Sequence, residues 1–352
     1  MIYLFLVKGI KIRLDPLPFR NDKCRDFCSR YDGYGDFYSD TNVDKNLATV
    51  PLFNKTLEDN PIYSTPILAI AGISHNSLCI CLETLLMQLG IIPENVIVTV
   101  NEKFSESLAL IDLFGFRGAK TASSSTYMEH YEKSLSKAWE LHPAKDKIIV
   151  IEEDLILSPD FLYTFALLRE IFRKDETVGE IQMWNPNSYD IVNGSIELIY
   201  RVDNFYGLEY LLRRSFYDKN MKNSFKECCS KQNPLPPLAD IDTLRKETYE
   251  NFLIQSIKSS TLLKSLEKCD TINTDMHNLI KKQNTSDTFK FIYQQESIDD
   301  FQSLIPILPC FGLFPLEPLG LYQGILRFIS NKYNFYLIRS KSPLYKSIRT
   351  VA

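Results

Sequence analysis

The sequence predicts an α/β fold built on a mostly parallel sheet with helices on both faces. Three short, mainly apolar runs, at residues 67–72, 95–100 and 147–151, are each typical of a strand that is buried on both faces. Segments with helical periodicity separate these runs. Strands and helices in regular alternation indicate a doubly wound domain.

The helices are predicted from their ends and from one clear periodic face. Asn76 is placed to cap the first helix, and Gly115 ends the second. In the third helix, bulky residues recur every fourth position from Tyr127 to Trp139, which predicts one buried face. The four predicted helices lie near residues 76–89, at about 105–114, at 126–141, and from Pro159 to about Arg173.

The alternating pattern does not cover the whole chain. Residues 1–60 are polar, aromatic and irregular, and residues 218–240 are rich in Lys, Asn, Cys, Ser and Pro, which predicts an irregular linker. We therefore predict an entering segment, a main domain, a linker and a C-terminal section, at 1–60, 61–217, 218–240 and 241–352. Within the last section we expect a long polar helix at about 243–267 and strands at 288–294 and 333–339.

Composition excludes some classes of function. The chain has 352 residues and a net charge of -4, with no long block of basic residues, which argues against a nucleic-acid-binding protein. The apolar start at residues 1–7 is far shorter than the roughly 20 residues that span a bilayer, and it lacks the features of a signal peptide. From the sequence alone we therefore expect a soluble protein without a membrane anchor.

Cysteines and glycosylation patterns point the other way, to the secretory pathway. The eight cysteines do not have the ligand spacing of a zinc site, and some could form disulfides. Cys79 and Cys81 lie in an apolar helical run and are expected to be buried thiols. Three acceptor patterns for N-glycosylation begin at Asn54, Asn193 and Asn284.

The strongest chemical signal is a run of three acids, Glu152, Glu153 and Asp154, directly after the third predicted strand. In open α/β sheets ligands bind beyond the carboxyl ends of the strands. Clustered carboxylates there are stabilised by a hard divalent cation, which also bridges to the oxygens of a nucleotide diphosphate. The alternative is that these acids cap the following helix or are simply solvated.

The context of the acids resembles that of the β-1,2-N-acetylglucosaminyltransferases that act on mannose in glycoproteins. The string at 149–155 and the Ser-Pro-Asp-Phe at 158–161 are similar to the family's acid segment. The closer resemblance is to the member that acts on O-linked mannose of proteins. Other similar segments follow in the same order from about residue 24 to the end, at 27–35, 66–72, 113–118, 130–131, 184–185, 198–202, 212–215 and 241–250.

The resemblance implies a nucleotide-sugar-binding glycosyltransferase A-type fold, with 61–217 as the donor domain. It implies a Golgi enzyme on the lumenal side, dependent on Mn²⁺ and inverting, which transfers N-acetylglucosamine from UDP-GlcNAc to a mannose-bearing glycoprotein acceptor. Carried over by position, Asp154 would bind the metal, Glu153 would face the ribose and Glu152 would contact the sugar hydroxyls. His130 would approach the uracil; the alternative is a histidine packed beside Tyr127 and Tyr131.

The chain also departs from the family pattern. Ser74 stands where the family has an arginine that helps hold the nucleotide, and Asn101 where it has an aspartate that reads the uracil. Pro186 stands where the family has a further aspartate. The segment 206–210 differs from the family's acceptor-side motif, and the Trp/Asp-rich stretch that holds the catalytic base is missing. The acceptor half is therefore expected to be incomplete, the base is unknown, and the family's membrane anchor is absent.

Two main hypotheses follow. The chain is either a metal-dependent acetylglucosaminyltransferase or a catalytically inactive family member that binds glycan, nucleotide or a partner transferase. The retained acids favour the first, and the lost base favours the second. A third possibility is an α/β protein whose strand-end acids bind nothing.

Overall fold

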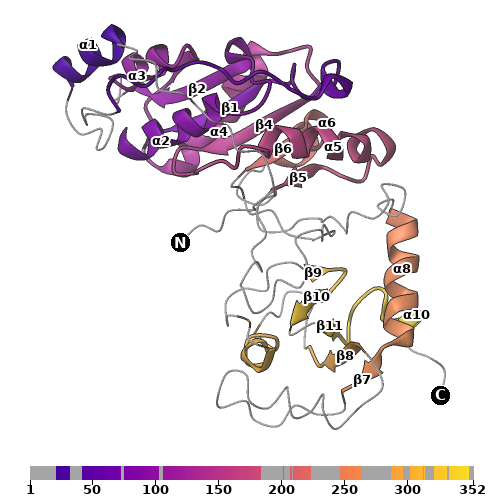
Figure 1. Cartoon of the computed structure of the whole chain (residues 1–352). Helices are drawn as coiled ribbons and strands as arrows, with labels where there is room; N and C mark the ends of the chain where they lie inside the picture. The colour runs from indigo at the N-terminus through magenta and orange to yellow at the C-terminus, as the bar shows by residue number, and fades with distance from the viewer. Residues whose placement is uncertain are drawn as a thin grey trace. The chain divides into compact units, whose positions relative to one another are not determined.

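The computed structural model describes residues 21–31, 42–72, 75–102, 106–183, 201, 207, 209–222, 246–263, 287–295, 302–311, 313, 321–330 and 333–348. The chain forms two compact units, shown in Figure 1. The N-terminal unit comprises residues 1–172, 179–183 and 207–225, and the C-terminal unit comprises 173–178, 184–206 and 226–352. Within the described residues, each unit contains one sheet.

The N-terminal unit is built on a six-stranded mixed sheet with the order β3-β2-β1-β4-β6-β5. The first four strands along the chain are parallel, and β6 runs antiparallel between β4 and β5. The strands are β1 (Ile67–Ala71), β2 (Val96–Asn101), β3 (Arg117–Thr121), β4 (Lys147–Glu152), β5 (Glu180–Gln182) and β6 (Tyr210–Arg213). The predicted α/β fold with a mostly parallel sheet is confirmed.

Helices cover both faces of this sheet. Every residue of β1 and β2 is buried, as expected for strands that are covered on both sides. From β1 the chain steps to β2 and β3 on one side, and then returns across β1 to β4. Parallel crossovers are almost always right-handed, so α2 (His75–Leu86) and α3 (Ser107–Leu113) lie on one face and α4 (Tyr127–Leu141) lies on the other.

The predicted helices of this unit are confirmed, with shifted ends. Thr126 caps α4 by accepting a hydrogen bond from the backbone N–H of Glu129, and Gly115 follows α3 with a φ of +73°. The fourth helix, α5, spans Phe161–Lys174. Because α2 begins at His75, Asn76 lies within its first turn and is not the cap.

One prediction for the N-terminal unit was wrong, and one of its strands was not predicted. Residues 1–60 are not irregular throughout, because Asp22–Arg30 forms α1, capped by the side chain of Asn21, and Lys55–Leu57 forms the short 3-10 helix η2. The strand β3 was missed, because its residues Arg-Gly-Ala-Lys-Thr are mostly exposed at the sheet edge and lack an apolar run.

The first residues of the expected linker at 218–240 are helical. The short helix α6 (Arg214–Phe216) continues into a π-helix at Tyr217–Met221. Tyr217 packs against Trp139 of α4, with ring centroids 5.6 Å apart. The rest of that segment, from residue 223, lies outside the described residues.

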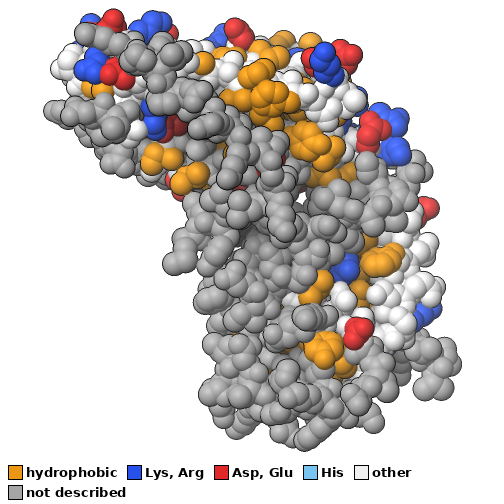
Figure 2. Space-filling view, viewed as in Figure 1, with side chains coloured by type: hydrophobic (Ala, Val, Ile, Leu, Met, Phe, Trp, Pro, Cys, Tyr) orange, Lys and Arg blue, Asp and Glu red, His pale blue; other side chains and the backbone are white. Residues whose placement is uncertain are grey.

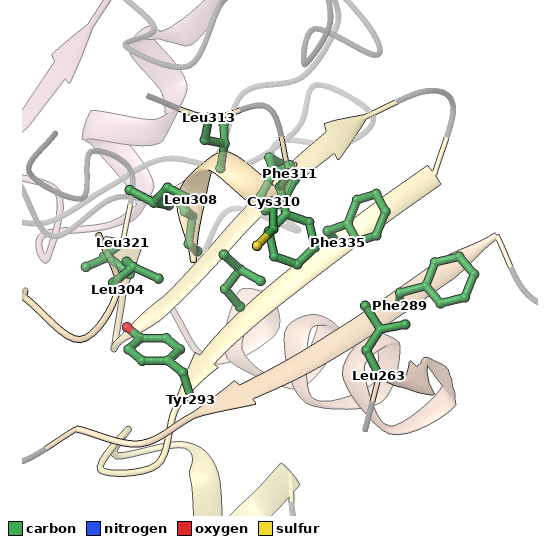
Figure 3. Packing of buried hydrophobic residues seen from close by; sticks show 13 residues of the cluster. Leu263, Phe289, Tyr293, Leu304, Leu308, Cys310, Phe311, Leu313, Leu321 and Phe335 are labelled. Atoms are coloured by element: carbon green, nitrogen blue, oxygen red, sulfur yellow. The ribbon is translucent and has the colours of Figure 1, made fainter. Parts of the chain in front are cut away.

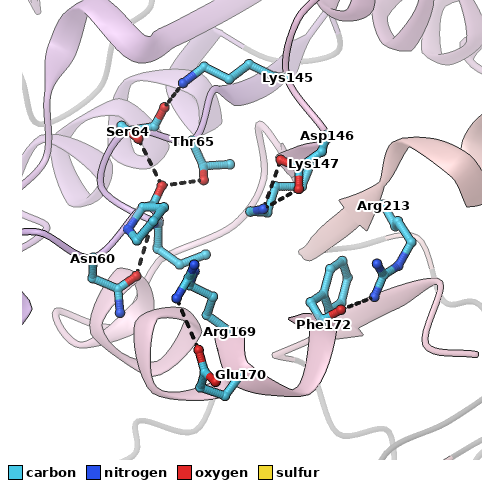
Figure 4. Close-up of polar contacts among 12 residues, drawn as sticks. Asn60, Ser64, Thr65, Lys145, Asp146, Lys147, Arg169, Glu170, Phe172 and Arg213 are labelled. Atoms are coloured by element: carbon cyan, nitrogen blue, oxygen red, sulfur yellow. Dashed lines mark hydrogen bonds and ion pairs between the residues drawn. The ribbon is translucent and has the colours of Figure 1, made fainter. Parts of the chain in front are cut away.

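The segment before β1 is bonded to residues at the N-terminal edge of the sheet, and Figure 4 shows one of these contacts, between Ser64 and Lys145. Lys145 donates to the carbonyl of Ser64 at 2.7 Å just before β4 begins, and Asn95 donates to the carbonyl of Tyr63 at 3.2 Å just before β2 begins. Gly90 donates its backbone N–H to the carbonyl of Val50 at 2.9 Å. These contacts fix residues 50–66 at the edge opposite the strands' carboxyl ends.

The C-terminal unit contains a five-stranded sheet with the order β7-β8-β11-β10-β9. Two of its strands, β8 (Thr288–Tyr293) and β11 (Tyr333–Arg339), match the predicted strands at 288–294 and 333–339. The predicted helix at 243–267 is wrong at its C-terminal end, because α8 spans Lys246–Ser259 and a strand follows. The remaining elements are β7 (Thr261–Leu262), η7 (Leu308–Phe311), β9 (Leu321–Tyr322), β10 (Ile325–Ser330) and α10 (Tyr345–Ile348).

Leucine and aromatic side chains together form one core of the C-terminal unit (Figure 3). Phe335 of β11 packs against Phe289, Phe311 and Phe328, with ring centroids 5.3 to 5.7 Å apart. Contacts of this kind add to the hydrophobic energy of burial. Cys310, in the same cluster, is disulfide-bonded.

Cys79 and Cys81 are free and buried, as predicted. On the face shown in Figure 2, acidic, basic and hydrophobic side chains are interspersed over the described surface. Among the described residues, no helix is both long and apolar enough to cross a membrane.

A buried ion pair organises one part of the C-terminal unit. Arg201 donates to Asp175 at 2.7 Å and to the hydroxyl of Thr177 at 2.7 Å. Asp175 also accepts from the backbone N–H of Thr177, and from that of Lys246 in the first turn of α8. Burial by itself would raise the pKa of Asp175. The hydrogen bond from the Thr177 hydroxyl, the hydrogen bond and charge of Arg201, and the bond from the Thr177 backbone N–H outweigh it and hold the pKa below its usual value.

We expect Asp175→Asn to lower the free energy of unfolding at pH 7 by about 3–5 kcal/mol, because it leaves the Arg201 charge buried and unpaired. A lowered carboxyl pKa stabilises the fold at pH values above the ordinary value of 3.8, and this contribution is lost as the pH falls through the folded-state pKa. The variant's stability should therefore fall less than that of the wild type between pH 7 and pH values below 3.8. Urea denaturation at several pH values measures both effects.

The matched control is Glu176→Gln, which removes the charge of the exposed neighbouring acid and should leave stability nearly unchanged. A loss for Asp175→Asn that is no larger than the loss for Glu176→Gln would contradict the assigned role of the ion pair.

Candidate active site

The acid run lies at the point in the sheet where the strand order reverses, with β2 on one side of β1 and β4 on the other. Because β1 pairs in parallel with both β2 and β4, the carboxyl ends of the three strands meet at one edge, and Glu152 at the end of β4 lies opposite Ile70 of β1. The chain leaves β1 toward β2 on one side and occupies β4 on the other. Such a switch point is where open α/β sheets bind ligands.

Glu153 connects the ends of β1 and β4. It is 2% exposed, and its carboxylate accepts a hydrogen bond of 2.8 Å from the backbone N–H of Gly72. Its own backbone N–H donates to the carbonyl of Ile70 at 3.2 Å. Gly72 has a φ of +153°, which a residue with a side chain rarely adopts. Glu153 therefore fixes the turn that follows β4.

His130, on α4, is buried beneath the same edge. One ring nitrogen, Nε2, lies 2.7 Å from the carbonyl oxygen of Ala71, and the other, Nδ1, lies 3.0 Å from the hydroxyl of Thr121. Burial lowers the pKa of His130, which favours the neutral ring. A neutral ring fits these contacts, with Nε2–H donating to the carbonyl and Nδ1 accepting from the hydroxyl. Both polar atoms of His130 thus bond to the ends of β1 and β3.

Glu152 is paired with a tyrosine of α4. The hydroxyl of Tyr127 donates to the Glu152 carboxylate in a short hydrogen bond. Burial raises the pKa of Glu152 to about 7, the Tyr127 hydrogen bond opposes this, and the charges of Asp154 and Glu153 add to it. Burial and the Glu152 charge also raise the pKa of Tyr127. The packing of α4 on this face of the sheet therefore places Tyr127, one of the bulky residues of its predicted buried face, against the acid run.

Asp154 differs from its two neighbours because it lies exposed in the turn after β4. Among the described residues, no hydrogen bond or ion pair engages its carboxylate. The acid run therefore contains one buried structural carboxylate, one carboxylate bonded to tyrosine, and one carboxylate that faces solvent. Asn101, at the end of β2, is also buried at this edge, whereas Ser74 and Pro186 lie outside the described residues.

A fourth acid, Glu209, joins this edge and was missed by the sequence analysis. It directly precedes β6, whose first residue, Tyr210, pairs with Val150 of β4. The Glu209 backbone carbonyl accepts from the N–H of Met183 at 3.2 Å. Its side-chain Oε2 is buried and has no hydrogen-bond partner in the described part of the chain. Burial, followed by the charges of Glu152 and Asp154, raises its pKa to about 7.

A signal for Glu209 was present in the sequence. The segment 206–210 differs from the family's acceptor-side motif by placing a glutamate where that motif has a glycine. The importance of the change appears only when β6 pairs with β4, because the two strands are far apart in the sequence.

Carboxylate oxygens are suitable ligands for a hard divalent cation. The described acids at this edge do not, however, form a complete set of protein ligands for one. Within the described residues, no three Asp, Glu, His or Cys side chains are grouped so that they could hold a metal ion. One exposed carboxylate, Asp154, can accept a cation that takes its other ligands from phosphate oxygens and water. Mg²⁺ and similar ions are commonly bound by one or two carboxylates plus substrate phosphates.

Part of the chain is similar in sequence to a curated protein. A curated relative, the alpha-1,3-mannosyl-glycoprotein 2-beta-N-acetylglucosaminyltransferase of Arabidopsis thaliana, is 29% identical over 90 residues, which are 26% of this chain. The match spans 20% of that relative's length.

Two solved structures are similar at low identity. A 4-diphosphocytidyl-2C-methyl-D-erythritol synthase from Anaerococcus prevotii aligns with a TM-score of 0.29 and 12% identity over 55% of this chain and 86% of the other. A cytidylyltransferase from Leptospira borgpetersenii aligns with a TM-score of 0.31 and 14% identity over 63% and 98%.

The family comparison covers the site itself. The matched segment begins just before α4 and ends just after the π-helix, so it contains His130, the acid run and Glu209. Over residues 122–223 the chain carries the sequence pattern of the GNT-I family.

Proposed function

We propose that this chain is a glycosyltransferase that moves N-acetylglucosamine from UDP-GlcNAc to a mannose of a glycoprotein glycan, in β-1,2 linkage and with inversion. The observation that carries the proposal is the acid turn at the β1/β4 switch point, within the segment that matches the GNT-I family. The same resemblance supports a Golgi location on the lumenal side. The disulfide at Cys310 agrees with an oxidising compartment.

The donor would lie across the carboxyl ends of β1 and β4. Asp154 would hold Mn²⁺, which when bound neutralises charge on the departing diphosphate. Glu153 fixes the turn that carries Asp154 through its bond to Gly72. Glu152, held by Tyr127, lies beside Asp154 and is available for the sugar hydroxyls. Because the ring nitrogens of His130 bond to Ala71 and Thr121, its contact with the uracil would be through the ring edge or face.

Glu209 is our candidate for the catalytic base, a group that the sequence alone does not identify. An inverting transfer needs a group that accepts the proton of the acceptor hydroxyl as that oxygen attacks the sugar carbon. The described acids at this edge other than Glu209 are bonded to the protein, as with Glu152 and Glu153, or assigned to the cation, as with Asp154. Glu209 has a buried, unbonded carboxylate oxygen and a pKa near 7, which suits a base at neutral pH.

A second candidate function is donor or glycan binding without transfer. It is favoured by the loss of the family's base-bearing Trp/Asp-rich stretch from the sequence, because binding at the acid edge does not need a base whereas transfer does. The two candidates differ in turnover and not in the location of the site.

We expect UDP-GlcNAc to bind the full chain in a Mn²⁺-dependent manner, and Asp154→Ala to weaken binding at least about tenfold, equal to about 1.4 kcal/mol. The physical reason is the loss of the exposed carboxylate that would share the cation with the diphosphate. Isothermal titration calorimetry with and without Mn²⁺ measures this. The matched control is Asp59→Ala, an exposed acid of the segment before β1. Binding that is absent in the wild type, or unaffected by Asp154→Ala, would contradict the proposed donor site.

We expect Glu209→Gln to reduce transfer about 100-fold or more while Mn²⁺-dependent donor binding persists, because the amide cannot accept the acceptor proton. The measurement is incorporation of radiolabelled N-acetylglucosamine into a mannose-terminated glycopeptide. Full turnover by Glu209→Gln would exclude it as the base. A wild-type chain that binds donor without any transfer would support the second candidate function.

A further inference from the structure

Of the three glycosylation acceptor patterns, only Asn54-Lys55-Thr56 lies wholly within the described residues. Lys55 and Thr56 are exposed, and Asn54 is partly exposed. The triplet occupies the start of η2, in the segment that lies along the N-terminal edge of the sheet. A bulky group attached here would extend into solvent, as N-linked glycans do.

The local geometry prepares the Asn54 amide. Its side-chain oxygen accepts a hydrogen bond of 3.1 Å from the backbone N–H of Thr56 and another of 2.6 Å from the Thr56 hydroxyl. Two donors on the amide oxygen withdraw electron density from the amide and make its nitrogen easier to deprotonate. Within the described residues the Nδ2 group donates no hydrogen bond. The reacting nitrogen is therefore not held by a hydrogen bond within the described residues, while the oxygen is polarised by the hydroxyl that the acceptor pattern requires.

The neighbouring surface also suits an attached sugar. Phe53 is 63% exposed, the highest value among the large hydrophobic side chains that the structure describes as exposed. The apolar face of a sugar ring linked to the next residue could cover this aromatic ring and remove apolar surface from water. The glycan would then shield a hydrophobic side chain that is otherwise largely exposed to solvent.

The position is compatible with an open site at the acid edge. The flanking residues of the segment are fixed at the N-terminal edge of the sheet by the bond from Gly90 to Val50 and by the bond from Lys145 to Ser64. Figure 4 shows the second of these bonds. Parallel strands separate that edge from their carboxyl ends, where Asp154 lies. A glycan on Asn54 therefore would not occupy the proposed donor site.

We propose that Asn54 carries an N-linked glycan. The Nδ2 atom forms a bond to the anomeric carbon of an oligosaccharide delivered on a polyprenyl diphosphate. The bond from that carbon to the diphosphate oxygen breaks, the polyprenyl diphosphate leaves, and the amide proton passes to a base of the transferring enzyme. The disulfide at Cys310 supports the inference independently, because it belongs to the same oxidising compartment in which this transfer takes place.

The test uses the full chain secreted from eukaryotic cells behind a cleavable leader. Peptides that contain Asn54 are treated with peptide N-glycosidase in ¹⁸O-labelled water, which converts a glycosylated asparagine into labelled aspartate. We expect label at Asn54 in the wild type and in Thr56→Ser, which keeps the hydroxyl. We expect its complete loss in Thr56→Ala and in Lys55→Pro, which breaks the acceptor pattern.

An unmodified Asn54 in secreted wild-type protein would overturn the proposal, since secretion shows that the chain passed through the compartment. Label in Thr56→Ala equal to that in the wild type would overturn it as well. Donor binding by Thr56→Ala separates this proposal from the proposed function. Donor binding by this variant should be unchanged whether or not Asn54 is found to be glycosylated, because Thr56 is not part of the acid edge.

Discussion

The parallel pairing of β1 with β2 on one side and β4 on the other is the constraint on which the N-terminal unit depends. A central strand buried on both faces must be apolar along its length, and helices must cover it from both sides. Because the three strands are parallel, the carboxyl ends of β1, β2 and β4 then lie at the same edge of the sheet. The acid run, the buried histidine and the turn at Gly72 all take their positions from this pairing.

The charged forms of the carboxylates at that edge are electrostatically unfavourable. Burial disfavours the charged forms of Glu152 and Glu209, and the nearby carboxylates repel one another. The protein relieves part of this cost with hydrogen bonds from Tyr127 and from the Gly72 backbone, and it leaves Asp154 in water. A divalent cation or a bound cationic group would relieve the rest. Carboxylates arranged in this way are typical of functional sites, because a purely structural site gains nothing from the repulsion.

The sequence was informative where burial determines the pattern. The strands β1, β2 and β4 and the helices between them were predictable, because apolar runs and helical periodicity reflect the same two-sided burial. The edge strand β3 was not, since exposed residues such as Arg117 and Lys120 carry no such signal. The acids of the run were found because they are contiguous. Glu209 was not recognised, because its approach to Glu152 depends on antiparallel pairing between segments that are about sixty residues apart.

The interleaved boundaries of the two units have a practical consequence for dissection of the protein. Residues 173–178 and 184–206 belong to the C-terminal unit, although the chain returns to the N-terminal unit after each of them. The ion pair between Asp175 and Arg201, together with the bond from Lys246, ties these insertions to the later part of the chain. A fragment boundary at residue 225 or 226 would place both insertions in the N-terminal fragment and separate them from the C-terminal unit to which they belong. The two units are therefore discontinuous in sequence, and their separate expression calls for circular permutation or co-expression rather than simple truncation.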